Sequence, residues 1–119
     1  MSRLAAETAA RGARPNVVWH SGKLRARQTA EAFWRECNPL ARCVAVRDLQ
    51  PEDPPEWIRN RLRGERGDLL IAGYFPHLTG LLTLLLGNDA GPFPLHGVVA
   101  LERDDDGETW REMWRIENG

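Results

Sequence analysis

Residues 16–36, NVVWHSGKLRARQTAEAFWRE, place a short apolar run directly before a stretch with helical periodicity. The run predicts a buried β-strand over residues 16–20, and the Ser-Gly pair at 21–22 breaks it. A helix is expected over residues 23–36, because apolar side chains recur there at helical spacing. The residues of that stripe are Ala26, Ala30, Phe33, Trp34 and Cys37. A strand that runs straight into a helix is typical of sheets with parallel members.

The same alternation continues on both sides of this unit. The further elements that the sequence predicts are a helix over residues 2–13, a strand over 42–47, a short helix marked by Trp57, Ile58 and Leu62 and closed by Gly64, a strand over 68–73, and a helix that begins at Pro76 and ends at Gly87. Residues 97–103 and 109–116 alternate like strands, and the turn signal at 104–108 predicts that they form a hairpin. We therefore expect a single α/β domain over residues 1–119, with three layers (α/β/α), a mostly parallel sheet and a C-terminal antiparallel hairpin.

Bulk composition narrows the classes of function. The 119 residues carry a formal net charge of −1, so no overall field favours nucleic acid or an anionic membrane as a partner. No apolar run approaches the roughly 18–20 residues that cross a bilayer, and we expect a cytoplasmic protein. Cys37 and Cys43 lack CxxC spacing, and the three histidines do not complete a zinc set. We expect no metal and no cofactor.

The corner after residue 20 is the first candidate site, because ligands of open parallel sheets bind at the carboxyl ends of the strands. Ser21 can cap the helix that follows, whose free N–H groups and dipole attract anions. Arg25 lies in the first turns of that helix, and its guanidinium fits phosphate oxygens. These features predict a phosphate site. The alternative is a capped surface helix with solvated arginines.

A longer motif favours the phosphate site. Residues 21–29 resemble the S-x-x-L-R-A-x-Q-T signature of the histidine phosphatase superfamily, the phosphoglycerate mutase-like proteins. Residues 19–26, WHSGKLRA, are especially similar to its SixA-type branch, the small phosphohistidine phosphatases. The resemblance continues in order through residues 49–51, 69–81 and 97–102, and so covers nearly the whole chain.

The chemistry that this resemblance implies is covalent. In the family, a histidine in an Arg-His-Gly motif on the first strand attacks the phosphoryl group, while two arginines and a second histidine neutralise its oxygens. Arg25 matches the second arginine. The chain begins at what resembles the family's first helix, so the strand with Arg-His-Gly has no match. Tyr74 occupies the place of the second histidine, in Gly73-Tyr74-Phe75-Pro76 instead of Gly-His-x-Pro. We therefore expect Arg25, Ser21 and Tyr74 to form a partial phosphate site with impaired or absent catalysis.

Three other histidines are weak candidates for a catalytic role. His96 lies in Leu95-His96-Gly97, which imitates Arg-His-Gly without the arginine, and a turn or edge role is the alternative. His77 follows Pro76 in the first turn of a helix, where it can line the pocket. The dipole of that helix favours the neutral imidazole. His20 precedes Ser21 and can touch a ligand there.

The unmatched strand is central in the family, between the third parallel strand and the antiparallel tail, so open edges are expected. Three arrangements are compatible with these open edges. Residues 68–73 pair directly with 97–103, two copies join as a homodimer, or the domain is only marginally stable. Three functions stay open. The chain binds phosphate on a protein or small molecule without turnover, it is an active phosphatase that uses a relocated histidine or a strand from another chain, or it is an interaction module that pairs through its sheet edge.

Overall fold

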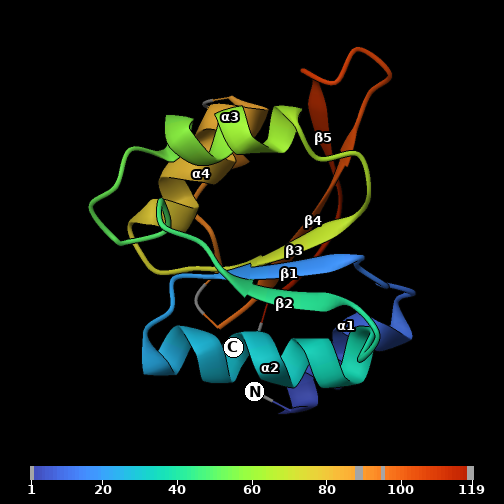
Figure 1. The fold of residues 1–119 in the computed structure, drawn as a ribbon. Coiled ribbons are helices and arrows are strands. Elements are labelled where there is room, and N and C mark those ends of the chain that lie inside the picture. Colours follow the sequence, from blue (N-terminus) through green and yellow to red (C-terminus); the bar gives the residue numbers. More distant parts are fainter. Residues whose placement is uncertain (1, 88–89, 95, 118–119) are drawn as a thin grey trace.

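Two small sheets and four helices form the part of the chain that the computed structural model describes, residues 2–87, 90–94 and 96–117 (Figure 1). In chain order the elements are α1 (Ser2–Ala10), β1 (Val17–His20), α2 (Leu24–Cys37), β2 (Arg42–Ala45), α3 (Pro55–Arg63), β3 (Leu69–Ala72), α4 (His77–Leu86), β4 (Val98–Arg103) and β5 (Trp110–Ile116). Every expected element is present. The largest difference in bounds is at α1, which ends at Ala10 because the chain turns at Gly12, where φ is +92°.

The first sheet is parallel, with strand order β2-β1-β3. Val17 of β1 is in register with Arg42 of β2 and with Leu69 of β3. All four residues of β1 are buried, which explains why its sequence is a continuous apolar run instead of an alternating one. The carboxyl ends of the three strands therefore meet at one edge, as the alternation of strands and helices predicts.

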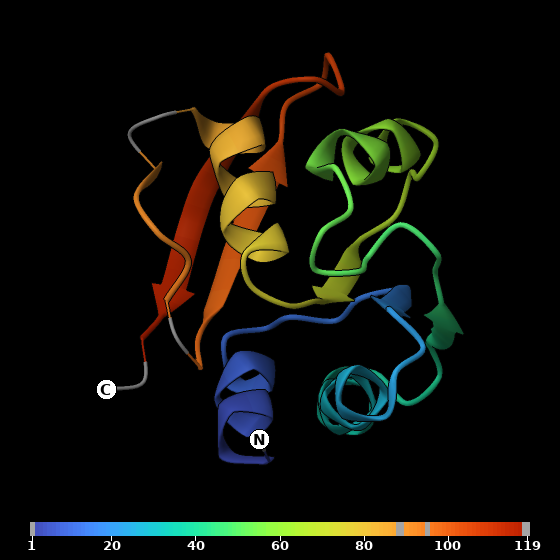
Figure 2. The ribbon, with the colours of Figure 1, turned by 90° about the vertical axis from the view of Figure 1, so that its left-hand side faces the viewer.

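Two helical layers cover this sheet, with α1 and α2 on one face and α3 and α4 on the other (Figures 1 and 2). Successive residues of β1 point toward opposite helical layers. Trp19 packs in a cluster with Ile58 of α3 and Leu81 of α4, the α3/α4 cluster, and Val18 packs on the α2 side. Leu49 and Ile58 of the α3/α4 cluster are completely buried. Trp34, which was expected in the core, is half-buried, and its indole N–H donates a 2.7 Å hydrogen bond to the Ala41 carbonyl.

The hairpin of β4 and β5 forms a second sheet. Among the described residues, β3 is paired with β1 alone and β4 with β5 alone, so direct pairing of residues 68–73 with 97–103, one of the three alternatives, does not occur. Contacts with both helical layers hold the hairpin away from β3. Helix α4 packs on β5, and Ile116 is buried in the cluster of α1 and α2.

Arg103 fastens the hairpin to α3. Its guanidinium donates hydrogen bonds of 2.6 Å to the Leu62 carbonyl and 2.5 Å to the Glu65 carbonyl, at the negative end of the α3 dipole. It also lies 5.1 Å from the ring centre of Trp110, and Arg11 lies equally close to Trp114, at 5.1 Å. Both tryptophans are partly buried and pack against core clusters.

Candidate functional site

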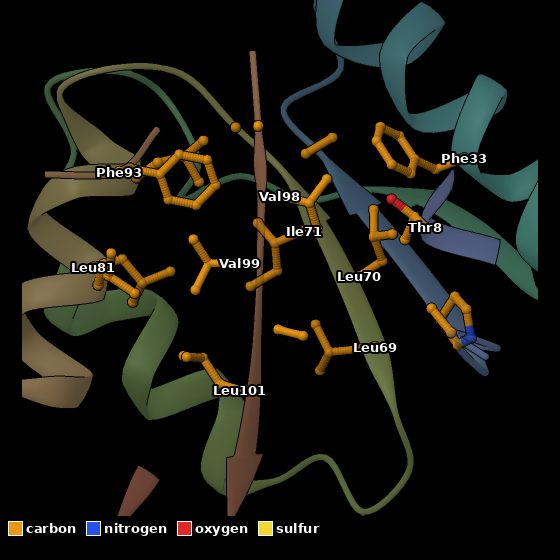
Figure 3. Close-up of a pocket in the computed structure, with 18 of the residues that line it drawn as sticks. Thr8, Phe33, Leu69, Leu70, Ile71, Leu81, Phe93, Val98, Val99 and Leu101 are labelled. Atoms are coloured by element: carbon orange, nitrogen blue, oxygen red, sulfur yellow. The ribbon is translucent and has the colours of Figure 1, made fainter. Parts of the chain in front are cut away.

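A cavity of about 890 Å³ separates β3 from β4 (Figure 3). Leu70 and Ile71 of β3 line it on one side, and Val98 and Val99 of β4 line it on the other. Helix α4 contributes Leu81 from one layer, and α1 and α2 contribute side chains from the opposite layer. The lining is largely apolar along the strands, and Thr8 of α1 adds a buried hydroxyl group beside Leu70 (Figure 3).

Arg25 and Tyr74 lie at the end of the cavity formed by the carboxyl ends of the parallel strands. Arg25 is the second residue of α2, directly after the corner that follows β1, and its side chain is exposed. Tyr74 follows β3 and is half-buried. Among the described residues Arg25 forms no ion pair, so its guanidinium is available to an anion. Two side chains nearly fifty positions apart thus border one cavity.

Ser21 does not take the role expected of it. Lys23 is the residue that precedes the first turn of α2, and no side chain caps that turn. The hydroxyl of Ser21 accepts a long 3.4 Å hydrogen bond from the Lys23 N–H, because Gly22, with φ of +91°, turns the chain before the helix begins. The prediction that Ser21 caps the helix is therefore wrong, and Ser21 is not among the described residues that line the cavity.

His20 holds the corner between β1 and α2. Its ring is buried, and its Nδ1 accepts a 3.0 Å hydrogen bond from the Gly22 N–H. Burial lowers the pKa of His20, the Glu31 carboxylate opposes that shift, and Arg27 reinforces it. The ring is therefore neutral at pH 7, with its Nδ1 lone pair already engaged. His20 is not among the described residues that line the cavity.

His77 lies in the interior instead of in the cavity wall. It is the first residue of α4 and only 2% exposed, and neither ring nitrogen has a hydrogen-bond partner among the described residues. Burial lowers the pKa of His77, while the Asp53 carboxylate and the main chain of Asp48 oppose that shift. The expectation that His77 lines the pocket is wrong: His77 is not among the described lining residues, because α4 turns this position toward Asp48 and Asp53 in the loop before α3.

His96 is the histidine that borders the cavity in the described part of the chain. It is exposed, with φ of +51°, and lies just before β4, at the same end as Tyr74. Its neighbour Leu95 lies outside the described residues. The opposite end of the cavity is bordered by Arg14 and Arg66, which the sequence did not single out. Both are isolated loop arginines without a motif, so only the fold reveals that they lie together.

The described residues offer neither a metal centre nor a membrane-spanning helix. They contain no group of three or more His, Cys, Asp or Glu side chains that could hold a metal ion. None of the helices in those residues combines the length and hydropathy that a bilayer crossing requires.

Comparison with known proteins identifies the fold. No protein-family model and no curated protein matches the sequence. A protein assigned as the phosphohistidine phosphatase SixA from Agrobacterium tumefaciens superposes with a TM-score of 0.79 at 21% identity, over 98% of this chain and 79% of that chain. The protein histidine phosphatase SixA in complex with tungstate superposes with a TM-score of 0.82 at 20% identity, over 98% of this chain and 78% of that chain. The chain therefore has the fold of the SixA phosphohistidine phosphatases, as the resemblance of residues 21–29 implied.

Proposed function

We propose that this chain is a SixA-like domain that binds a phosphoryl group, carried by a protein or a small molecule, between Arg25 and Tyr74. The observation that carries the proposal is that Arg25, which forms no ion pair with the described residues, and Tyr74, from a separate strand-to-helix corner, border one cavity at the carboxyl ends of the strands. A protein of the same fold is known in complex with tungstate, a tetrahedral oxyanion like phosphate.

The two side chains offer complementary contacts to such an anion. The Arg25 guanidinium can donate two parallel hydrogen bonds and supplies the positive charge. The N-terminal turn of α2, where Arg25 lies, adds the positive end of the helix dipole. Tyr74 can donate one hydrogen bond through its hydroxyl group but brings no positive charge at neutral pH. This set favours binding of an oxyanion more than stabilisation of the additional charge in a transition state.

We further propose that these residues hydrolyse phosphohistidine poorly or not at all. A nucleophilic imidazole needs an unprotonated nitrogen that can reach the phosphorus atom. His20 already accepts a hydrogen bond through Nδ1, and His77 is buried away from the cavity. Tyr74 stands where the resemblance places a second histidine, so the charge of that group is missing as well.

His96 supports a second candidate function, phosphoryl transfer to a relocated histidine. It is exposed and borders the same cavity as Arg25 and Tyr74. In this version an imidazole nitrogen of His96 attacks the phosphorus atom of a phosphohistidine, the phosphorus–nitrogen bond of the substrate breaks, and the substrate imidazole leaves with a proton from water. A second water molecule then cleaves the bond between His96 and phosphorus and releases phosphate. Turnover that persists in the parent chain and disappears in His96→Ala would favour this candidate over binding alone.

Tungstate titration tests the proposed site. We expect Arg25→Ala to weaken tungstate binding by about tenfold or more, because a charge-assisted hydrogen-bonding group contributes about 1.5–3 kcal/mol. Isothermal titration calorimetry on the purified chain measures the dissociation constant.

Arg27→Ala is the matched control for charge. Arg27 lies on the same helix and is exposed, but it pairs with Glu31 and is not among the described residues that line the cavity. We expect its loss to change the affinity by only about twofold, through long-range electrostatics. Equal losses for the two variants, or a parent chain that binds no tungstate, would refute the Arg25 site.

A further inference from the structure

We propose that Phe75 and Phe93 form an aromatic subsite beside the phosphoryl site, and that this subsite selects a phosphoryl group carried on a phenol ring. The ligand class is therefore an aryl phosphate. The inference rests on the proposed function, because it identifies the group that is bonded to the phosphoryl group held by Arg25 and Tyr74.

The aromatic pair lies at the same end of the cavity as the proposed phosphoryl site. Phe75 directly follows Tyr74, and both residues border the cavity. Phe93, in the segment between α4 and β4, borders it as well, and its ring lies on the α4 side of β4 (Figure 3). The main-chain N–H of Phe93 donates a 3.4 Å hydrogen bond to the Thr79 hydroxyl, which ties this segment to α4. A carrier group bonded to the phosphoryl group therefore has the aromatic pair beside it.

The two rings are arranged to accept a third. Their centres lie 6.0 Å apart and their planes are inclined at 68°, which is an edge-to-face contact. Phe93 is half-buried, whereas Phe75 is 41% exposed. A single exposed apolar side chain is common on protein surfaces, and that is the alternative reading of Phe75. The exposed ring adjoins a candidate anion site on the same cavity, however, so a ligand bound there can cover it.

The chemistry of this wall discriminates between carriers of the phosphoryl group. Pro94 also borders the cavity, and the side chains of Phe75, Phe93 and Pro94 have neither a hydrogen-bond donor nor an acceptor. An aliphatic carrier covers less of the rings and gains no stacking. An imidazole carrier, as in phosphohistidine, places its second nitrogen against side chains that cannot pair with it. A phenol ring stacks on the same wall and has no such nitrogen, so it fits best.

Phosphonates, which the chain cannot hydrolyse, test the subsite on the intact 119-residue protein. The probes are phenylphosphonate, methylphosphonate and pyrazol-4-ylphosphonate, whose five-membered ring has the N–H group and the acceptor nitrogen of an azole. Calorimetry gives the three dissociation constants. We expect phenylphosphonate to bind about tenfold more tightly than methylphosphonate, and about threefold or more tightly than the pyrazole compound.

Variants of the two rings locate this preference. Phe75→Leu and Phe93→Leu each remove an aromatic ring but keep an apolar side chain. We expect the preference for phenylphosphonate over methylphosphonate to fall to about threefold or less in Phe75→Leu. Tungstate carries no ring, so its binding should weaken less than that of phenylphosphonate, and it reports that the variant is folded.

Leu24→Ala is the matched control for an exposed apolar side chain. Leu24 directly precedes Arg25 and is 68% exposed, but it is not among the described residues that line the cavity. We expect this variant to keep the parent preference for phenylphosphonate.

A fourth ligand distinguishes two sources of an aryl phosphate. The peptide acetyl-Ala-Ala-X-Ala-Ala-amide, in which X is 4-phosphonophenylalanine, presents the same ring on a polypeptide. Tighter binding than that of phenylphosphonate identifies a phosphorylated tyrosine side chain as the carrier, and weaker binding identifies a small aryl phosphate. Both results support a subsite for the ring.

Three results would overturn the aromatic subsite while tungstate still binds in an Arg25-dependent manner, which leaves the phosphoryl site standing. The first is equal affinity for phenylphosphonate and methylphosphonate. The second is a preference for phenylphosphonate that survives in both Phe75→Leu and Phe93→Leu. The third is tighter binding of the pyrazole compound than of phenylphosphonate. A parent chain that binds no tungstate would overturn the phosphoryl site and the subsite with it.

Discussion

Replacing Ile58 by alanine is expected to lower the free energy of unfolding by about 3 kcal/mol. Ile58 lies on α3, is completely buried, and joins Trp19, Leu49 and Leu81 in the cluster between the parallel sheet and the α3/α4 layer. Its truncation removes buried methyl groups and leaves a cavity that the rigid neighbours cannot fill. A loss of this size is a large share of the stability of a domain of this length. Urea denaturation followed by circular dichroism measures it.

Trp57→Ala is the matched control on the same helix. Trp57 is the larger side chain but is 47% exposed, and it lies outside the described core clusters. We expect its truncation to cost less than about 1 kcal/mol. If Trp57→Ala were as destabilising as Ile58→Ala, the placement of α3 on the sheet would be incorrect, because the helix would then face the core with its other side.

Acidification from pH 7.5 to pH 5 is expected to destabilise the domain, and His77 is expected to be a main cause. Burial lowers the pKa of His77 in the folded state, so below its ordinary value of 6.5 the unfolded chain binds more protons than the folded chain. The contribution of His77 to the free energy of unfolding is therefore complete above pH 6.5. It is lost as the pH falls toward the pKa of His77 in the folded state. Each unit between the two pKa values costs about 1.4 kcal/mol.

The His77→Leu variant isolates this contribution. It removes a buried ring whose nitrogens have no partner in the described residues, so we expect the difference in stability between pH 7.5 and pH 5 to shrink. His20 also has a pKa lowered by burial and retains part of the difference. His96→Leu, at an exposed position, is the control and should keep the parent dependence. An unchanged pH dependence in His77→Leu would place the buried titrating group elsewhere.

Local patterns in the sequence were sufficient for the fold class. The apolar run at residues 17–19 has the length of a buried strand, and turn residues separate it from the helix that follows. The same signals located each later helix and strand to within a few residues. The resemblance of residues 21–29 added what periodicity cannot supply, namely the overall topology of a SixA-like protein, which the superpositions confirm.

The candidate site was harder to predict, because it depends on contacts between distant segments. Arg25 could be proposed from its place at a helix start, and Tyr74 only through the resemblance, which places it where the family has its second histidine. Whether Ser21 caps α2 depends on one extra residue in the corner, since Lys23 takes the position before the first turn. The burial of His77 depends on how α4 rotates against the loop before α3. Helical periodicity alone does not fix that rotation.

The separation of β3 from β4 was the least predictable feature. The apolar patterns of residues 68–73 and 97–103 are as compatible with direct pairing as with two separate sheets. Side chains elsewhere decide between them. Arg103 fastens the hairpin to the end of α3, and Ile116 fastens it to the α1/α2 layer, so β4 cannot move to β3 without breaking both contacts.

The measurement that tests the central claim most directly is release of phosphate from a phosphohistidine peptide, with tungstate affinity measured on the same preparation. The central claim is that Arg25 and Tyr74 bind a phosphoryl group, while residues 1–119 contain no histidine that acts as an effective nucleophile. We expect tungstate to bind the parent chain and to bind Arg25→Ala more weakly. We expect the parent chain to release phosphate no faster than Arg25→Ala does. Arg25-dependent release of phosphate that disappears in His96→Ala would contradict the claim and identify a working phosphatase.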